Sequence, residues 1–264
     1  MFKTHYDTMR PGPTPERVLS IARMLAKQPM TTQEIAQHCE LRENVSQISE
    51  GIRLSVSTAE ELGLIQKKDG ICVYIAGQEA ISSPAAFRQY VSGKVLTDPS
   101  TTFFKATEWF VAANDSIKSF GNFDTYRAEM GKAGISNIDI NDVLGWRFWI
   151  RFLGIAYQFH NTLIPNMAVR LNGVLMRLPT ETSMTAIEFL AWLKENVREA
   201  ASSCSQRQLC LAISNGLHTL EDLGKIQLIS IMDAGKVNLF PLPGVSTNNF
   251  SKIIIKEAIH NEMA

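Results

Sequence analysis

The stretch Gln206–Leu242, QRQLCLAISNGLHTLEDLGKIQLISIMDAGKVNLFPL, decides the fold because its pattern occurs twice in the chain. Moved back by 161 residues, its apolar positions fall on the apolar residues of an earlier stretch. The pairs are Ile48 with Leu209, Ile52 with Ile213, Val56 with Leu217, Ala59 with Leu220, Leu62 with Leu223 and Ile65 with Ile226. Spacings of three and four residues predict a helix with one buried face in each copy.

Both copies also end alike. Glu60-Glu61-Leu62-Gly63 corresponds to Glu221-Asp222-Leu223-Gly224, and a glycine in this place commonly ends a helix in the left-handed conformation. Turn signals follow, Asp69-Gly70 in the first copy and Asp233-Ala234-Gly235 in the second, and such residues join the strands of a hairpin. Each copy is therefore predicted to be a long helix that runs into a hairpin.

The predicted bounds are as follows. In the first copy the helix covers Glu43–Leu62 and the strands cover 64–66 and 71–75; in the second the helix covers Ser205–Leu223 and the strands cover Ile226–Met232 and Lys236–Phe240. Ahead of the first copy, Thr14-Pro15-Glu16 is a helix start. Thr31 and Glu34 have the spacing of a capping box that opens a short second helix within Met30–Glu40.

The middle of the chain contains further helix signals. Helices are predicted after Ser82-Ser83-Pro84, over Ser100–Ala113, over Phe123–Ala133 and over Val143–His160, the last of them capped by Asn141 or Asp142 and apolar nearly all round. A short strand is predicted at Val174–Leu178, followed by a helix over Ala186–Ala200 that Thr182 or Ser183 caps. The tail Asn249–Met263 is predicted to form a last helix.

A helix closed by Leu-Gly and followed by a two-stranded ribbon resembles the winged-helix superfamily, and this chain resembles it twice. The resemblance implies a mainly α fold with small β-hairpins, in which two winged helix-turn-helix domains are joined by a helical segment. The expected parts are a flexible arm at 1–13, a winged-helix domain at 14–78, a helical linker at 79–140, a second winged-helix domain at 141–243 and a C-terminal helix at 244–264.

Composition limits the function classes. The chain has 26 Lys and Arg against 26 Asp and Glu, so no global field draws it onto nucleic acid and any DNA contact must come from a local patch. Its four cysteines lack CxxC spacing, which favours reduced thiols in a cytoplasmic protein over a zinc site. The sequence also lacks a phosphate loop, a GxSxG elbow and an HExxH motif, so no enzyme and no cofactor is expected.

The winged-helix resemblance implies which residues would meet DNA, because the third helix of that fold enters the major groove and the wing reaches phosphates. In the first domain the candidates are the helix residues Arg42, Asn44, Ser46, Gln47 and Arg53 and the wing residues Lys67 and Lys68. In the second domain they are Gln206 and Arg207, with Ser205 and Gln208 beside them, and Lys236 at the wing. The first domain is expected to be the main contact, because aromatic neighbours suggest that the second is more buried.

Two function classes stay open. One is a double-stranded DNA-binding protein, either a transcriptional regulator or an accessory subunit of a bacterial phage-defence or DNA-processing system. The other is a scaffold, similar to the kleisin-binding subunits of chromosome-organising ATPases, that holds a protein partner from the same operon and reads no DNA. The run Ile253-Ile254-Ile255 is too apolar for one helical face, so a homodimer is expected. Arg147, Arg151 and His160 argue against a membrane span at Val143–Ile164.

Overall fold

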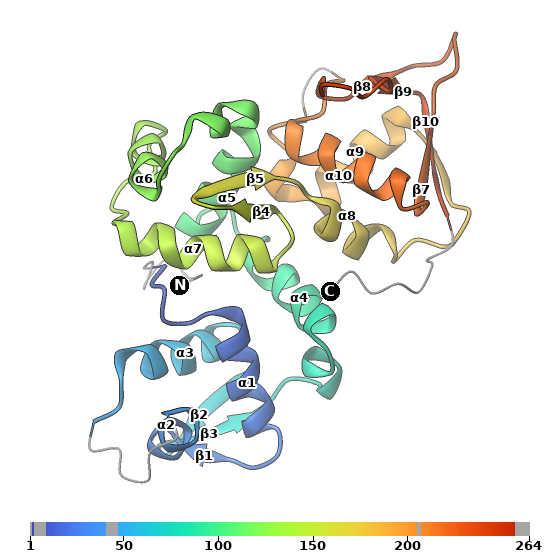
Figure 1. The fold of residues 1–264 in the computed structure, drawn as a ribbon. Helices are drawn as coiled ribbons and strands as arrows, with labels where there is room; N and C mark the ends of the chain where they lie inside the picture. Colours follow the sequence, from blue (N-terminus) through green and yellow to red (C-terminus); the bar gives the residue numbers. More distant parts are fainter. Residues whose placement is uncertain (1, 3–8, 41–46, 205–206, 257–264) are drawn as a thin grey trace. The chain divides into compact units, whose positions relative to one another are not determined.

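The structure is a computed structural model that describes residues 2, 9–40, 47–204 and 207–256 (Figure 1). It is mainly helical with small antiparallel sheets, as the sequence predicts. Contacts divide the chain into two compact units, the first formed by residues 1–105 and 123–152 and the second by residues 106–122 and 153–264. The predicted parts at 79–140 and 141–243 divide the chain differently, because residues 140–152 belong to the first unit.

The first unit begins with six elements that hold one three-stranded sheet. In chain order they are α1 Pro15–Leu25, β1 Met30–Thr31, α2 Thr32–Glu40, α3 Glu50–Glu61, β2 Ile65–Lys68 and β3 Ile71–Tyr74. The strands lie in the order β1-β3-β2, and both pairs are antiparallel. The three helices bury Val18, Ile21, Ile35, Val56 and Ala59, and these side chains form the apolar core of this part of the unit.

Four further elements complete the first unit. They are the 3-10 turn η1 Gln78–Ile81 and the helices α4 Pro84–Val95, α6 Phe123–Lys132 and α7 Ile140–Phe152, while α5 Thr102–Ala112 contributes residues to both units. Ser83 caps α4 through a hydrogen bond that its Oγ accepts from the Ala86 amide at 3.0 Å. The helix starts at Thr14 and Ser83 and the helices near Ser100–Ala113 and Phe123–Ala133 are thus where the sequence predicts them.

The segment before α1 is held against α7, so the expectation of a flexible arm is wrong for its described residues. Met9 is fully buried, and the Trp149 indole N–H donates to the Pro13 carbonyl at 2.9 Å. Gly145 makes this approach feasible, because a Cβ there would lie 1.7 Å from the Met9 carbonyl oxygen. Phe2 is also buried, with its ring edge-to-face against Trp149.

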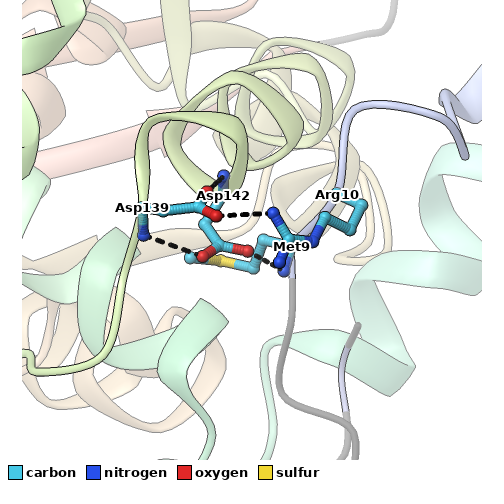
Figure 2. Close-up of polar contacts among 4 residues, drawn as sticks. All are labelled: Met9, Arg10, Asp139 and Asp142. Carbon is cyan, nitrogen blue, oxygen red and sulfur yellow. Dashed lines mark hydrogen bonds and ion pairs between the residues drawn. The ribbon is translucent and has the colours of Figure 1, made fainter.

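Two carboxylates at the start of α7 fasten the same segment (Figure 2). Asp139 and Asp142 cap each other's backbone amides at 3.0 and 2.9 Å. Asp142 also accepts the Met9 amide at 2.8 Å, and Arg10 donates to Asp139 at 2.6 Å. Hydrogen bonds from the Asp142 amide and from Arg10 hold the pKa of Asp139 below its usual range, whereas burial raises the pKa of Asp142. The helix cap is therefore Asp139, and Asp142 is its reciprocal partner.

The second unit repeats the first element order. Its matching set is α8 Ala168–Leu175, β6 Ser183–Thr185, α9 Ala186–Asn196, α10 Leu211–Asp222, β7 Ile226–Ile229 and β10 Lys252–Ile255. Its strands lie in the order β6-β10-β7, again antiparallel throughout. The same unit holds the turns η2 Asn114–Ser119 and η3 Arg198–Ala200, the hairpin β4 Ala156–Phe159 with β5 Thr162–Pro165, and the pair β8 Val237–Asn238 with β9 Asn249–Phe250.

The offset of 161 residues holds for the third helix and the strand that follows it. α3 and α10 have equivalent bounds, and Gly63 and Gly224 end them in the left-handed conformation with φ of 69° and 68°. The Leu64 amide donates to the Ala59 carbonyl, and the Lys225 amide donates to the Leu220 carbonyl, at 3.0 and 2.9 Å. One pair of the apolar stripe differs, because Leu62 is buried but Leu223 is 43% exposed.

Both helices begin later than predicted, at Glu50 and Leu211. Ser49 and Cys210 precede them in an extended conformation, which sets the helix starts. Ile48 and Leu209 therefore occupy equivalent places ahead of the helices and not within them. The predicted starts at Glu43 and Ser205 lie outside the described residues.

The predicted helix Val143–His160 is wrong in its second half, and the predicted strand Val174–Leu178 is wrong. α7 ends at Phe152 because Gly154 takes a φ of 73° beside Val169, and the alternating residues that follow form the β4–β5 hairpin. Val174 lies in α8, and the strand that precedes α9 is β6. The N-cap of α9 is then Thr185, the last residue of β6, and not Thr182 or Ser183 as predicted.

The predicted second hairpin is also wrong, and so is the predicted C-terminal helix over residues 249–256, while the rest of that helix lies outside the described residues. β7 pairs with β10, so residues 230–251 are an insertion between the two strands, and β8 within it pairs with β9. Three adjacent β-branched residues favour a strand, and Ile253 and Ile255 point into the core while Ile254 is half-buried on the other face. The argument for a dimer from a surplus of apolar helix surface therefore loses its premise.

Candidate nucleic-acid interface

One face of α3 is open to solvent in the first unit. Ile52, Val56 and Ala59 face the core, which turns the other side of the helix outward. The exposed positions along that side are Glu50, Arg53, Ser57 and Glu60. Arg53 is therefore the cation of this face, and it stands between two carboxylates.

The β2–β3 hairpin carries two adjacent cationic candidates of the first unit, Lys67 and Lys68. Lys67 pairs with Cys72 and Lys68 with Ile71, and Asp69 and Gly70 close the turn with φ of 51° and 80°. Both positive φ values are those of the tight two-residue turn that the sequence predicts. The lysines thus lie in the last two residues of β2, directly before the turn and on opposite faces of the strand.

The two lysines are fully available to a ligand. Both are exposed, and neither takes part in an ion pair with any residue that the structure describes. Gln47 is exposed in the bend ahead of α3, so it is placed beside the helix and not on it. The other first-domain candidates, Arg42, Asn44 and Ser46, lie outside the described residues, as does Gln206 in the second domain.

The third helix of the second unit is enclosed, in contrast to α3. Its amide at Leu211 donates to Asn114 Oδ1 of η2 at 2.8 Å, and its Asn215 side chain donates to the Pro165 carbonyl of β5 at the same distance. Gly216 lies so close to α8 that a Cβ would be 2.9 Å from the Ala168 backbone nitrogen. No residue from Leu211 to Leu220 is exposed. This helix offers no face to a DNA groove.

The remaining candidates of the second unit lie near each other but away from any hairpin tip. A bridge between Gln208 and Asn238 joins the segments that carry Arg207 and Lys236. Arg207 is exposed with a φ of 61°, and its carbonyl accepts the Asn238 amide at 2.8 Å. Lys236 is half-buried ahead of β8, so its predicted place at a wing tip is wrong.

Apolar residues occupy the insertion where the first unit has its lysines. Ile231 is 51% exposed and Met232 is 91% exposed, just after β7. Ile187 of α9 is 40% exposed, and its Cγ1 lies 3.7 Å from a Cβ built at Gly235. We call Ile187, Ile231 and Met232 the apolar tip. The equivalent ends of the two sheets thus differ in chemical character, one cationic and the other apolar.

The described residues form no candidate metal site and no candidate membrane span. None of their His, Cys, Asp and Glu side chains form a group of three or more that could hold a metal ion. No helix in this part of the chain is long and apolar enough to cross a membrane. The search for family models finds no match to this sequence, and neither a curated protein nor a solved structure matches it.

Sequence reasoning missed two features of the second unit. The first is which residues cover α10: aromatic neighbours indicated a more buried helix, but nothing in the sequence links Asn114 to a helix that starts 97 positions later. The second is a capping box in α9, where Thr185 and Glu188 exchange hydrogen bonds at 2.8 and 3.2 Å. The signal for it was present, because Met30-Thr31 and Glu34 recur as Met184-Thr185 and Glu188 with the same spacing.

Proposed function

We propose that the chain is a duplex-DNA-binding protein built from two winged-helix domains, of which the first makes the contact. The repeated order of helices and strands and the repeated sheet order support the two domains. The second domain consists of the set from α8 to β10. The observation that carries the functional proposal is the exposed hairpin with Lys67 and Lys68 beside an uncovered α3.

The chemistry of the contact follows from the charges. Lysines at a hairpin end neutralise phosphates, which gives affinity and salt dependence without reading sequence. Arg53 is placed to meet a phosphate or a guanine, whereas Glu50 and Glu60 oppose deep entry of α3 into a groove. The protein is therefore a sequence-tolerant or moderately specific binder, used as a regulator or as an accessory subunit of a DNA-processing system.

The test is duplex binding by fluorescence anisotropy over a range of salt concentrations. Lys67→Ala with Lys68→Ala should weaken binding and flatten the log–log salt slope by about two, because each phosphate contact contributes about 0.9. The matched control removes Lys105 and Lys118, two exposed lysines of α5 and η2. Both double variants should melt like the parent protein.

Two results would overturn the proposal. One is the absence of duplex binding by the intact protein at low salt. The other is an equal loss of affinity in the two double variants, which would mean that affinity depends on the net charge of the protein and not on where the lysines lie. Either result would remove the hairpin from the interface.

A scaffold function is the second candidate, and the apolar tip favours it. Large exposed apolar side chains are typical of protein-binding surfaces, and no residue of α10 from Leu211 to Leu220 is exposed. In this function the second domain would hold a protein chain, as kleisin-binding subunits do. Met232→Asp with Ile231→Asp should then abolish co-purification with a partner encoded in the same operon while duplex binding is unchanged.

A further inference from the structure

Arg147 of α7 is a half-buried cation without a counterion among the described residues. Its guanidinium carbon lies over the rings of Phe123 and Phe148, 4.7 Å from the centre of each. Its Nε is buried, and no acceptor in the described part of the chain lies within hydrogen-bond distance of it. Aromatic rings attract the charge of an arginine but give its N–H groups no hydrogen-bond acceptor. The guanidinium is therefore held in place while its hydrogen-bonding capacity is unused.

The carboxylates of the two helices that hold Arg147 already have partners. α6 packs against α7 (Figure 1), and both acidic residues of α6 form ion pairs within that helix. The pairs are Asp124 with Arg127 at 3.7 Å and Glu129 with Lys132 at 2.6 Å. The acidic residue of α7 is Asp142, whose two oxygens accept backbone amides from the segments that precede α1 and α7. These helices therefore supply no anion to Arg147.

Arg151 adds a second positive charge one turn further along α7. Residues four apart on a helix are neighbours on its surface, and Arg151 is exposed. Burial, and after it the charge of Arg151, lower the pKa of Arg147. An arginine nevertheless keeps its proton at neutral pH. Because like charges at this spacing repel each other, an anion bound at this place would relieve the repulsion.

We propose that Arg147 and Arg151 form a phosphate-binding site on α7 that takes the phosphoryl group of a phosphate ester. The planar guanidinium presents a pair of N–H groups that matches two phosphate oxygens. Phe123 and Phe148 position the guanidinium before the ligand arrives, which lowers the cost of ordering it. The phosphoryl group can belong to a free nucleotide or to the backbone of bound DNA, and only the second source rests on the proposed function.

The first experiment measures thermal unfolding of the full chain with increasing inorganic phosphate, against chloride at equal ionic strength. The Tm of the parent protein should rise as the site fills. Arg147→Met should weaken the apparent phosphate affinity by about tenfold or more, because it removes hydrogen bonds to a charged group, and Arg151→Met should weaken it less. Arg177→Met removes an exposed arginine of the second unit and serves as the control.

The readout is the difference between the variants and the parent, because phosphate also stabilises folded proteins by its exclusion from their surface. A parent response that does not saturate overturns the proposal, and so does an equal response in Arg147→Met and Arg177→Met. Arg147→Lys retains the charge without the planar pair of donors, so it should keep part of the response. It also tests the site if Arg147→Met fails to fold, which circular dichroism reports. A response in Arg147→Lys equal to that of the parent contradicts the role of the guanidinium.

The second experiment identifies the source of the phosphoryl group from the salt dependence of duplex binding. If the DNA backbone supplies it, Arg147→Met with Arg151→Met should lower the log–log salt slope by about two. A slope equal to that of the parent assigns the site to a free phosphate ester. The two proposals fail separately. Absence of duplex binding would leave the phosphate response intact, whereas loss of the site would leave the effect of the Lys67 and Lys68 substitutions on duplex binding.

Discussion

α3 and α10 are the same helix in sequence pattern, length and ending, yet they have different surroundings. α3 leaves Glu50, Arg53 and Ser57 in solvent, whereas η2, β5 and α8 enclose α10. The repeated stripe therefore determines which side of each helix packs inward. It does not determine whether the opposite side stays free, and that decides which copy has a surface for nucleic acid.

The connections that follow β2 and β7 also differ between the two units. In the first unit Asp69 and Gly70 join β2 to β3 directly, which leaves a short hairpin with two lysines. In the second unit residues 230–251 separate β7 from β10 and carry Ile231 and Met232 of the apolar tip. A common framework can thus present charge in one copy and apolar surface in the other. Substitutions at matched positions of the two units test this difference through their effects on stability.

The largest effect is expected at a buried ion pair in the second unit. Arg170 of α8 donates to Glu199 of η3 at 2.7 Å, and the Glu199 side chain has no exposed surface. Arg170→Met would leave a buried carboxylate without its partner, which costs about 3–5 kcal/mol of unfolding free energy. Denaturant unfolding followed by circular dichroism measures the change.

The matched variant is Arg10→Met in the first unit. Arg10 and Asp139 pair at 2.6 Å, but their side chains are 34% and 49% exposed, so the loss should be only about 0–1 kcal/mol. Arg170→Met combined with Glu199→Leu should recover most of the loss, since no charge then stays buried alone. Similar losses at Arg10 and Arg170 would contradict the difference in burial.

The next effect concerns the packing of the third helices. A Cβ at Gly216 would lie 2.9 Å from backbone atoms of Met167 and Ala168, so α8 and α10 would have to separate. Gly216→Ala should therefore destabilise by about 1–3 kcal/mol, although alanine is the better helix former by about 1 kcal/mol. A gain in stability on thermal unfolding would show that the close contact of α8 and α10 is wrong.

The equivalent position in α3 provides the control. Ser55 is buried there, and its hydroxyl donates to the Gly51 carbonyl at 2.6 Å. Ser55→Ala removes this bond without adding volume, so its effect should stay within about 1 kcal/mol. The two substitutions compare α10, whose packing against α8 requires a glycine at position 216, with α3, where a side chain already occupies the equivalent position.

The third effect compares the two glycines expected in turns. Gly70 has a φ of 80°, so Gly70→Ala forces a side chain into the left-handed region at about 1–2 kcal/mol. Gly235 has no such conformation, and a Cβ there would only touch Ile187 at 3.7 Å. Gly235→Ala should change stability by less than about 0.5 kcal/mol. Equal losses would mean that residues 233–235 form a tight turn after all.

The sequence predicted the parts of the fold that depend on local chemistry. The helix starts at Thr14 and Ser83, the capping box at Thr31 and the turn at Asp69-Gly70 all rest on residues within three or four positions of each other. The mainly α class followed from apolar spacing. Each of these elements forms from interactions that the neighbouring residues specify.

The errors lie where distant residues decide. Ile253-Ile254-Ile255 becomes a strand because β6 and β7 offer it two open edges, and no short window contains that information. Gly154 ends α7 against Val169 of α8, a contact that apolar periodicity does not express. Of the candidate site, the hairpin lysines are placed together, but Lys236 is moved from a wing tip by a strand pairing with residues beyond position 248.

The smallest effect is a pH dependence that the two copies should share. Thr31 with Glu34 and Thr185 with Glu188 form the same capping box, and hydrogen bonds from the threonine amide and hydroxyl lower the pKa of each glutamate. A carboxylate with a lowered pKa stabilises the folded state above its unfolded pKa of about 4.3, and that contribution is lost as the pH falls through the lower folded pKa. Glu34→Gln and Glu188→Gln should therefore be less stable than the parent at pH 7 and should approach it at pH 3. Denaturant unfolding of both variants at the two pH values measures this, and because both carboxylates are solvent-exposed, the differences should be the smallest of the four. A difference that stays constant with pH in one copy would show that its box is not formed, and the repeat would then extend to the third helices and their strands but not to the second.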